Sequence, residues 1–181
     1  MALEHAILVS LSERSASGSE LTRRFDKSIG FFWSATHQQI YKVLGRMEAD
    51  GWVTSRVVAQ QGRPDKKVYA VSDAGRAALA DWLAQPSKNA PMRSELAVKM
   101  RAASLATDRG SVLAVVRDNL AEHATRLAFY EQLCKQDYPE PAALTGADLD
   151  QYLVLRGGIR LEQGMVDWLT EYLDAHEKAQ A

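Results

Sequence analysis

The chain has little of several features that would place it outside the ordinary globular proteins. Its 181 residues include one cysteine, Cys134, so no internal disulfide can form. No apolar run approaches the roughly 18 residues that a transmembrane helix needs. The N-terminal residues lack the basic-then-apolar pattern of a signal peptide. With 5 prolines and 11 glycines the composition is neither collagen-like nor disordered. We therefore expect a soluble cytoplasmic protein that does not enter a membrane.

Neither sign of charge dominates the chain. The 22 basic and 23 acidic side chains give a formal charge of −1. Residues 1–80 carry 11 basic and 8 acidic side chains, whereas residues 81–181 carry 11 and 15. No overall charge excess draws the molecule to nucleic acid or to a membrane surface, but a mildly basic first half precedes an acidic second half.

The sequence also lacks the motifs of common catalytic and cofactor sites. It has no glycine-rich phosphate loop, no G-x-S-x-G motif and no clustered pair of carboxylates. His5, His37 and His176 are scattered without the spacing of metal ligands. We expect no enzyme activity, no metal site and no cofactor.

The first half of the chain has the pattern of three helices, a β-hairpin and a returning helix. Residues 15–18 are small and polar and predict a turn, and Ser17 and Glu20 have the capping-box spacing of a helix start. Residues 62–65, Gly-Arg-Pro-Asp, predict the turn of the hairpin. The predicted helices span residues 2–12, 18–26, 36–50 and 73–84, and the predicted strands span residues 52–58 and 67–71.

This order of elements is typical of a winged helix-turn-helix domain. In such domains the third helix enters the DNA major groove, and the hairpin, or wing, lies along the backbone or minor groove. The polar side chains of the third helix suit base edges and phosphates, and the hairpin tip is basic. The predicted DNA-binding residues are Gln38, Gln39, Tyr41, Lys42 and Arg46 on the helix and Arg63, Lys66 and Lys67 on the wing. A solvated polar face with a basic turn is the alternative, and Tyr41 suits the core equally well.

The second half of the chain is predicted to be almost wholly helical. Residues 85–91 are polar, contain two prolines and predict a linker between a domain of residues 1–84 and a domain of residues 92–181. Helices are expected over residues 94–105, 108–136 and 145–175, so the fold class is mainly α. The apolar stripes of the two long helices are Leu113, Val116, Leu120, His123, Leu127, Tyr130 and Cys134, and Tyr152, Leu155, Ile159, Val166, Leu169 and Leu173.

These stripes predict an antiparallel helical dimerisation domain. We expect the stripes to hold two copies of the chain together, and packing within one chain is the alternative. Gly157 and Gly158 inside the last helix would each cost about 1 kcal/mol relative to alanine. A partner helix therefore comes close to this pair, or the helix breaks there.

The chain resembles the PadR family of bacterial transcription regulators over nearly its whole length. Residues 38–53, QQIYKVLGRMEADGWV, are similar to the family's recognition helix, and residues 62–69, GRPDKKVY, to its basic wing. Residues 71–76, VSDAGR, are similar to the start of the helix after the wing. Residues 95–101 and 155–162 are similar to motifs of the family's C-terminal dimerisation domain.

The resemblance implies a homodimer that binds a roughly palindromic operator in double-stranded DNA. Such a protein represses transcription until a small effector, a phenolic acid or a hydrophobic compound, binds. An effector between the two domains would change the separation of the two recognition helices. The candidate effector-binding residues are His5, Leu8, His123 and Arg126, and a structural role is the alternative for His123. The alternative function is a winged-helix module that contacts proteins, or senses an effector, without recognising an operator.

Overall fold

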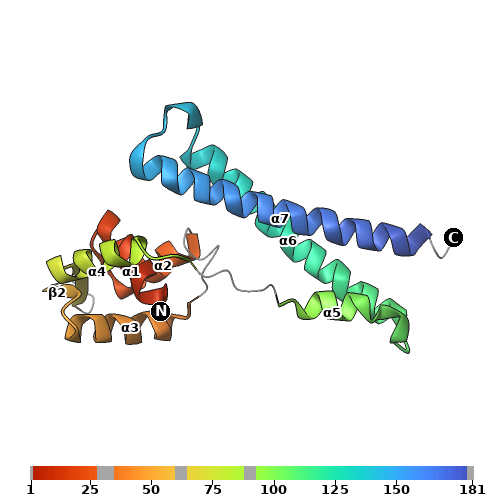
Figure 1. Cartoon of the computed structure of the whole chain (residues 1–181), viewed down its shortest axis with the longest axis horizontal. Helices are drawn as coiled ribbons and strands as arrows, with labels where there is room; N and C mark the ends of the chain where they lie inside the picture. The colour runs from red at the N-terminus through yellow and green to blue at the C-terminus, as the bar shows by residue number, and fades with distance from the viewer. Residues whose placement is uncertain (1, 28–34, 60–64, 88–92, 179–181) are drawn as a thin grey trace. The chain divides into compact units, whose positions relative to one another are not determined.

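The chain divides into two compact units, Met1–Asn89 and Ala90–Ala181 (Figure 1). The structure is a computed structural model that describes residues 2–27, 35–59, 65–87 and 93–178. Helices predominate in both units, and the first unit also contains a small antiparallel sheet, so the predicted fold class is confirmed. In these ranges no helix is both long enough and apolar enough to cross a lipid bilayer.

The first unit has the element order of a winged helix-turn-helix domain. Its three strands are antiparallel and lie in the order β1-β3-β2. In the described residues of this unit the elements are α1 (Ala2–Glu13), β1 (Ala16–Ser17), α2 (Gly18–Lys27), α3 (His37–Ala49), β2 (Val53–Val58), β3 (Lys66–Val71) and α4 (Asp73–Leu83).

Side-chain caps fix where the helices of the first unit begin. Thr36 and Gln39 form a capping box at α3, and the Ser72 hydroxyl accepts a hydrogen bond from the Gly75 N–H at α4. The helices bury their apolar residues in one core, which also contains residues of the three strands. Its fully or nearly fully buried members include Ile7, Leu8, Leu11, Leu21, Phe25, Ile40, Leu44, Met47 and Val53.

The strand β1 differs from the turn predicted at residues 15–18. Ala16 pairs with Tyr69 and Ser17 with Val68, so the expected two-stranded wing belongs to a three-stranded sheet. A strand of two residues is too short to show alternating polarity, and its pairing partner, β3, lies about fifty residues later in the sequence. The local sequence therefore shows only the turn composition.

The second unit is built on a long antiparallel helical hairpin. Its described elements are α5 (Glu95–Arg101), the 3-10 helix η2 (Ala103–Leu105), α6 (Arg109–Asp137), the 3-10 helix η3 (Pro141–Ala143) and α7 (Gly146–Lys178). Contacts between α6 and α7 join Arg109 to His176 and His123 to Glu162, so residue numbers rise along one helix as they fall along the other (Figure 1). The helix predicted over residues 94–105 ends earlier, and a 3-10 turn completes it.

Part of the predicted dimer stripe packs within a single chain. Leu113 and Val116 of α6 form a core with Leu169 and Leu173 of α7 and with Met100 of α5. The alternative of intramolecular packing is therefore correct for these residues. Helix α7 runs unbroken through positions 157 and 158, so a helix break at the glycine pair is wrong.

Candidate DNA-binding surface

Helix α3 separates its apolar residues from its polar residues. Ile40, Leu44 and Met47 are buried in the core of the first unit. Tyr41 was expected either on the surface or in the core, and at 43% exposed it lies on the surface. A Cβ atom added at Gly18 would lie only 2.5 Å from the Tyr41 ring, which shows that the ring rests on the start of α2. The face away from the core is therefore polar and fixed in position.

Gln38 and Lys42 lie one helical turn apart on this exposed face of α3. Among the described residues neither side chain has a hydrogen-bond or ion-pair partner. Gln39 differs, because its side-chain oxygen accepts a hydrogen bond of 2.8 Å from the Thr36 N–H in the capping box. Gln38 and Lys42 are consequently the α3 side chains most available to another molecule, and Gln39 also holds the helix start.

Arg46 is tied to another helix of the same unit. Its guanidinium group forms an ion pair with Glu4 of α1, whose side chain is 9% exposed, whereas that of Arg46 is 48% exposed. A carboxylate this buried needs a cation beside it, because an unpaired buried charge is costly. Arg46 therefore joins α1 to the last turn of α3 and has only part of its hydrogen-bonding capacity left for a ligand.

The two described wing lysines also form ion pairs. The Lys66 Nζ atom lies 2.5 Å from Glu20 Oε1, and the Lys67 Nζ atom lies 2.7 Å from Glu48 Oε2. The hydrogen bond from Lys66, together with that from the Ser17 N–H, lowers the pKa of Glu20 to about 2. Lys67 likewise lowers the pKa of Glu48. The third predicted wing residue, Arg63, lies outside the described residues.

Each unit contains two of the four candidate effector-binding residues. In the first unit the His5 ring stacks on Trp82, with centroids 4.5 Å apart, and lies 5.9 Å from Trp52. Leu8 is fully buried in the core, so a ligand would reach it only if the core opened.

In the second unit both candidates contact one carboxylate. The His123 Nδ1 atom lies 2.5 Å from Glu162 Oε2, and Arg126 donates a hydrogen bond of 3.2 Å to Glu162 Oε1. The pKa of the neighbouring Tyr130 hydroxyl is raised by burial and by the Glu162 charge. His123 and Arg126 thus already have a partner that links α6 to α7. Across the ranges that the structure describes, no three potential ligands gather as a metal site would require.

Two family descriptions match consecutive parts of the chain. Residues 7–81 match the transcriptional regulator PadR-like family, and residues 92–177 match the virulence activator alpha C-terminal domain. A probable transcriptional regulator of Mycobacterium tuberculosis is 51% identical over 97% of both chains. The chain belongs to the PadR-like family of transcriptional regulators. The negative transcriptional regulator PadR of Bacillus subtilis, at 31% identity over 97% of this chain and 98% of that one, is a further relative.

Solved structures of PadR-like proteins share the fold over both units. Bacillus subtilis PadR in complex with operator DNA superposes with a TM-score of 0.83 at 28% identity, covering 97% of this chain and 99% of that one. The same protein in complex with p-coumaric acid gives a TM-score of 0.76 at 28% identity, covering 97% and 98%. The Vibrio cholerae virulence activator AphA gives 0.78 at 32% identity, covering 99% of each chain.

The acidic partners of the predicted DNA-binding cations are not evident from the sequence. Glu20 was recognised only as a helix cap, and Glu4 and Glu48 were not selected. A weak signal was present, because successive strand residues point to opposite faces and must send Lys66 and Lys67 toward different elements. The distances in sequence between the paired residues, from 19 to 46, gave no local pattern for these contacts.

Proposed function

We propose that the chain is a homodimeric repressor that binds a palindromic DNA operator through its first unit. The observation that carries this proposal is the polar face of α3 at Gln38 and Lys42, two side chains without a partner in the described ranges, beside a basic hairpin. Glutamine suits adenine edges and lysine suits phosphates, so one face can read bases and hold the backbone. The likeness of the whole chain to a PadR protein in complex with operator DNA supports the proposal.

A second copy of the chain would cover an apolar row on α7. Val154, Leu161 and Trp168 are seven residues apart and are 52%, 63% and 37% exposed. Residues at this spacing share one face of a helix and can pack against a partner helix. One recognition helix contacts only a few base pairs, so a specific operator needs two helices about one DNA turn apart. In this proposal residues 92–181 dimerise, residues 1–84 bind DNA and residues 85–91 link them.

The family role supports a site of action on DNA inside the cell. A DNA-binding regulator of a bacterial type would work in the cytoplasm, and we assign no catalytic activity to the chain. The family consists of transcriptional regulators rather than enzymes.

A small aromatic acid would release the repressor from DNA. The complex of Bacillus subtilis PadR with p-coumaric acid supports this effector class. Of the four candidate residues, His5 is the best placed in the first unit, because its ring is half-buried between two tryptophans. Trp52 and Trp82 would therefore report binding. Titration with p-coumaric acid should change intrinsic tryptophan fluorescence and weaken DNA binding, and no change in either signal would contradict this part of the proposal.

DNA binding is tested by fluorescence anisotropy with duplexes selected from the host genome at several salt concentrations. Lys42→Ala should weaken binding to all duplexes and reduce the slope of log K against log salt by about 0.9, the value of one phosphate contact. Gln38→Ala should change the sequence preference with little change in slope. The absence of salt-sensitive binding to any duplex would contradict the proposal and favour a protein-contact module.

A further inference from the structure

The wing lysines are held by carboxylates from two different helices. Lys66 and Lys67 are neighbours on β3, so the strand directs their side chains to opposite faces. Lys66 reaches Glu20 in the first turn of α2, and Lys67 reaches Glu48 near the end of α3. Each lysine of this pair is therefore neutralised within the chain before any DNA arrives.

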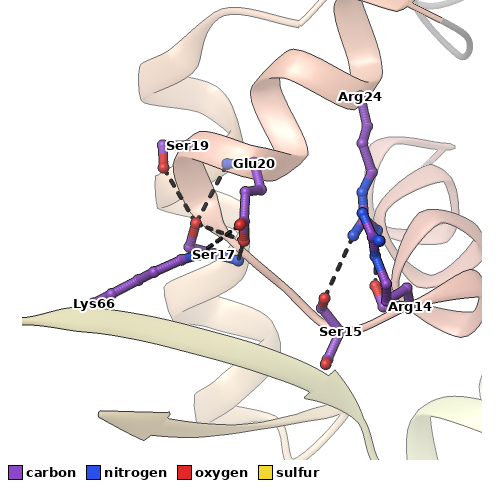
Figure 2. A network of polar contacts seen from close by, with 7 residues as sticks. All are labelled: Arg14, Ser15, Ser17, Ser19, Glu20, Arg24 and Lys66. Atoms are coloured by element: carbon purple, nitrogen blue, oxygen red, sulfur yellow. Dashed lines mark hydrogen bonds and ion pairs between the residues drawn. The ribbon is translucent and has the colours of Figure 1, made fainter. Parts of the chain in front are cut away.

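The Glu20 carboxylate is fixed by more than its lysine (Figure 2). Its Oε2 atom accepts hydrogen bonds of 2.8 Å from the Ser17 N–H and 3.0 Å from the Ser17 hydroxyl, while Oε1 faces Lys66. Ser17 belongs to β1, which pairs with β3 beside Lys66. The capping box of α2 thus holds the carboxylate in place whether or not the lysine is present.

The Glu48 carboxylate is positioned in a similar way. Its Oε1 atom accepts a hydrogen bond of 2.5 Å from the Ser55 hydroxyl on β2, and its Oε2 atom faces Lys67. The Lys67 ammonium also lies 5.3 Å from the centre of the Tyr69 ring. Lys67 therefore has two partners within its own chain.

Lys42 on α3 is the contrasting case. It has no ion-pair partner among the described residues. When such a lysine binds a phosphate, a counterion leaves the DNA and affinity falls with salt. When a paired lysine binds a phosphate, it frees a carboxylate that attracts a cation again. The net release of ions by Lys66 and Lys67 is then much smaller than that by Lys42.

We infer that Glu20 and Glu48 compete with DNA phosphates for Lys66 and Lys67 and so lower the affinity of the chain for duplex DNA of any sequence. This inference rests on the proposed DNA-binding function. It assigns the two glutamates as specificity-determining residues, because sequence-independent affinity comes almost wholly from phosphate contacts and base contacts must supply the rest. Lys66 and Lys67 contribute their full charge only when these carboxylates are removed.

Glutamine variants of the full chain test the competition. Glu48→Gln keeps an oxygen that can accept from Ser55, and Glu20→Gln keeps a residue suited to the capping box. Binding to an operator duplex and to a scrambled duplex is measured by anisotropy across a salt series. Each variant should bind both duplexes more tightly and increase the salt slope by about 0.9, which is about 3.5-fold in affinity between 50 and 200 mM salt.

Paired variants separate competition from a general gain in charge. Asp81→Asn removes one exposed negative charge on α4 that forms no ion pair with Lys66 or Lys67 among the described residues, and it serves as the charge-matched control. In a Lys67→Ala background, Glu48→Gln should have no larger effect than Asp81→Asn. Lys67→Ala alone should reduce the salt slope by less than half of the reduction caused by Lys42→Ala.

Two results would overturn the inference and leave the proposed function intact. The first is an effect of Glu48→Gln and Glu20→Gln equal to that of Asp81→Asn. The second is weaker DNA binding by the glutamine variants, which would mean that the carboxylates aim the lysines at DNA. If the wild-type chain binds no duplex in a salt-sensitive manner, the proposed function fails and the inference fails with it.

Discussion

The two units of the chain bury their apolar side chains to different extents. In the described residues the first unit has a core cluster of twelve buried residues, drawn from helices and strands far apart in sequence. The corresponding cluster of the second unit has five. Large exposed apolar side chains show the opposite distribution, with eight in the second unit and four in the first.

The first unit therefore buries most of its large apolar side chains by itself, whereas the second unit leaves more of them exposed to solvent. The first unit closes its sheet and helices around a single core, and α3 presents its polar side chains to solvent. The second unit uses one side of its long helical hairpin for its own core and leaves Val154, Leu161 and Trp168 uncovered. Exposed apolar rows of this kind mark protein interfaces, and this row supports our proposal that the second unit dimerises.

The largest expected effect is on dimerisation. Leu161→Glu should weaken the homodimer at least about 100-fold, because a symmetric interface loses the leucine twice and each burial contributes about 2 kcal/mol. Sedimentation velocity over a range of concentrations measures the change. Leu105→Glu, at an 84% exposed position on η2, is the control and should leave the dimer intact. Equal behaviour of the two variants would show that the α7 row is not the interface.

The second-largest expected effect is a loss of stability in the core of the first unit. A Cβ atom at Gly75 would lie 2.1 Å from the Trp52 carbonyl oxygen, a backbone atom that has little room to move. Gly75→Ala should therefore lower the free energy of unfolding of the first unit by about 1–3 kcal/mol. Urea unfolding followed by tryptophan fluorescence reports the change. An unchanged midpoint would mean that α4 shifts freely against the strand, contrary to a closed core.

A smaller change in the free energy of unfolding, of opposite sign, is expected at Gly45 on the surface of the first unit. Gly45 lies in α3 on the face of Lys42, and a Cβ atom there would meet nothing within 4 Å. Gly45→Ala should raise the free energy of unfolding by about 0.5–1 kcal/mol, because alanine loses less conformational freedom in a helix. The added methyl group should also lower operator affinity, since the face of α3 would sit less deeply in the groove. Thermal melting and anisotropy measure both, and a stabilised variant with unchanged operator affinity would argue against close approach at this position.

The smallest expected effect is a pH dependence of the stability of the first unit. The pKa of Glu20 is lowered from 4.5 to about 2, so the ionised carboxylate stabilises the folded state above pH 4.5. This stabilisation is lost as the pH falls through the window between these two values. The free energy of unfolding of the wild type should fall more steeply across this window than that of Glu20→Gln. Parallel acid-unfolding curves would show that the Lys66 pair does not persist in solution.

Most of the fold follows from local patterns in the sequence. Capping residues such as Ser17, Thr36 and Ser72 lie next to the helices that they start, and the apolar spacing of α3 correctly separates buried from exposed residues. The strand β1 was missed because its pairing with β3 is the only thing that makes it a strand. The stripes of α6 and α7 were correctly seen as apolar, but spacing alone does not say whether the partner helix belongs to the same chain.

The candidate site was predictable in its residue types and less so in its electrostatics. Helical periodicity placed Gln38 and Lys42 on an exposed face, and this placement depends only on neighbours in α3. The ion pairs of Lys66, Lys67 and Arg46 depend on contacts between residues up to 46 positions apart, which no local pattern records. A count of basic residues therefore overstates how many free cations the surface presents.

Sedimentation equilibrium of the full chain with an operator duplex selected from the host genome tests most directly whether two copies act on one DNA site. We expect a complex of two chains per duplex, with an affinity that falls as salt rises. A complex of one chain per duplex, or the absence of a salt-sensitive complex at micromolar concentration, would contradict the homodimeric DNA-binding role.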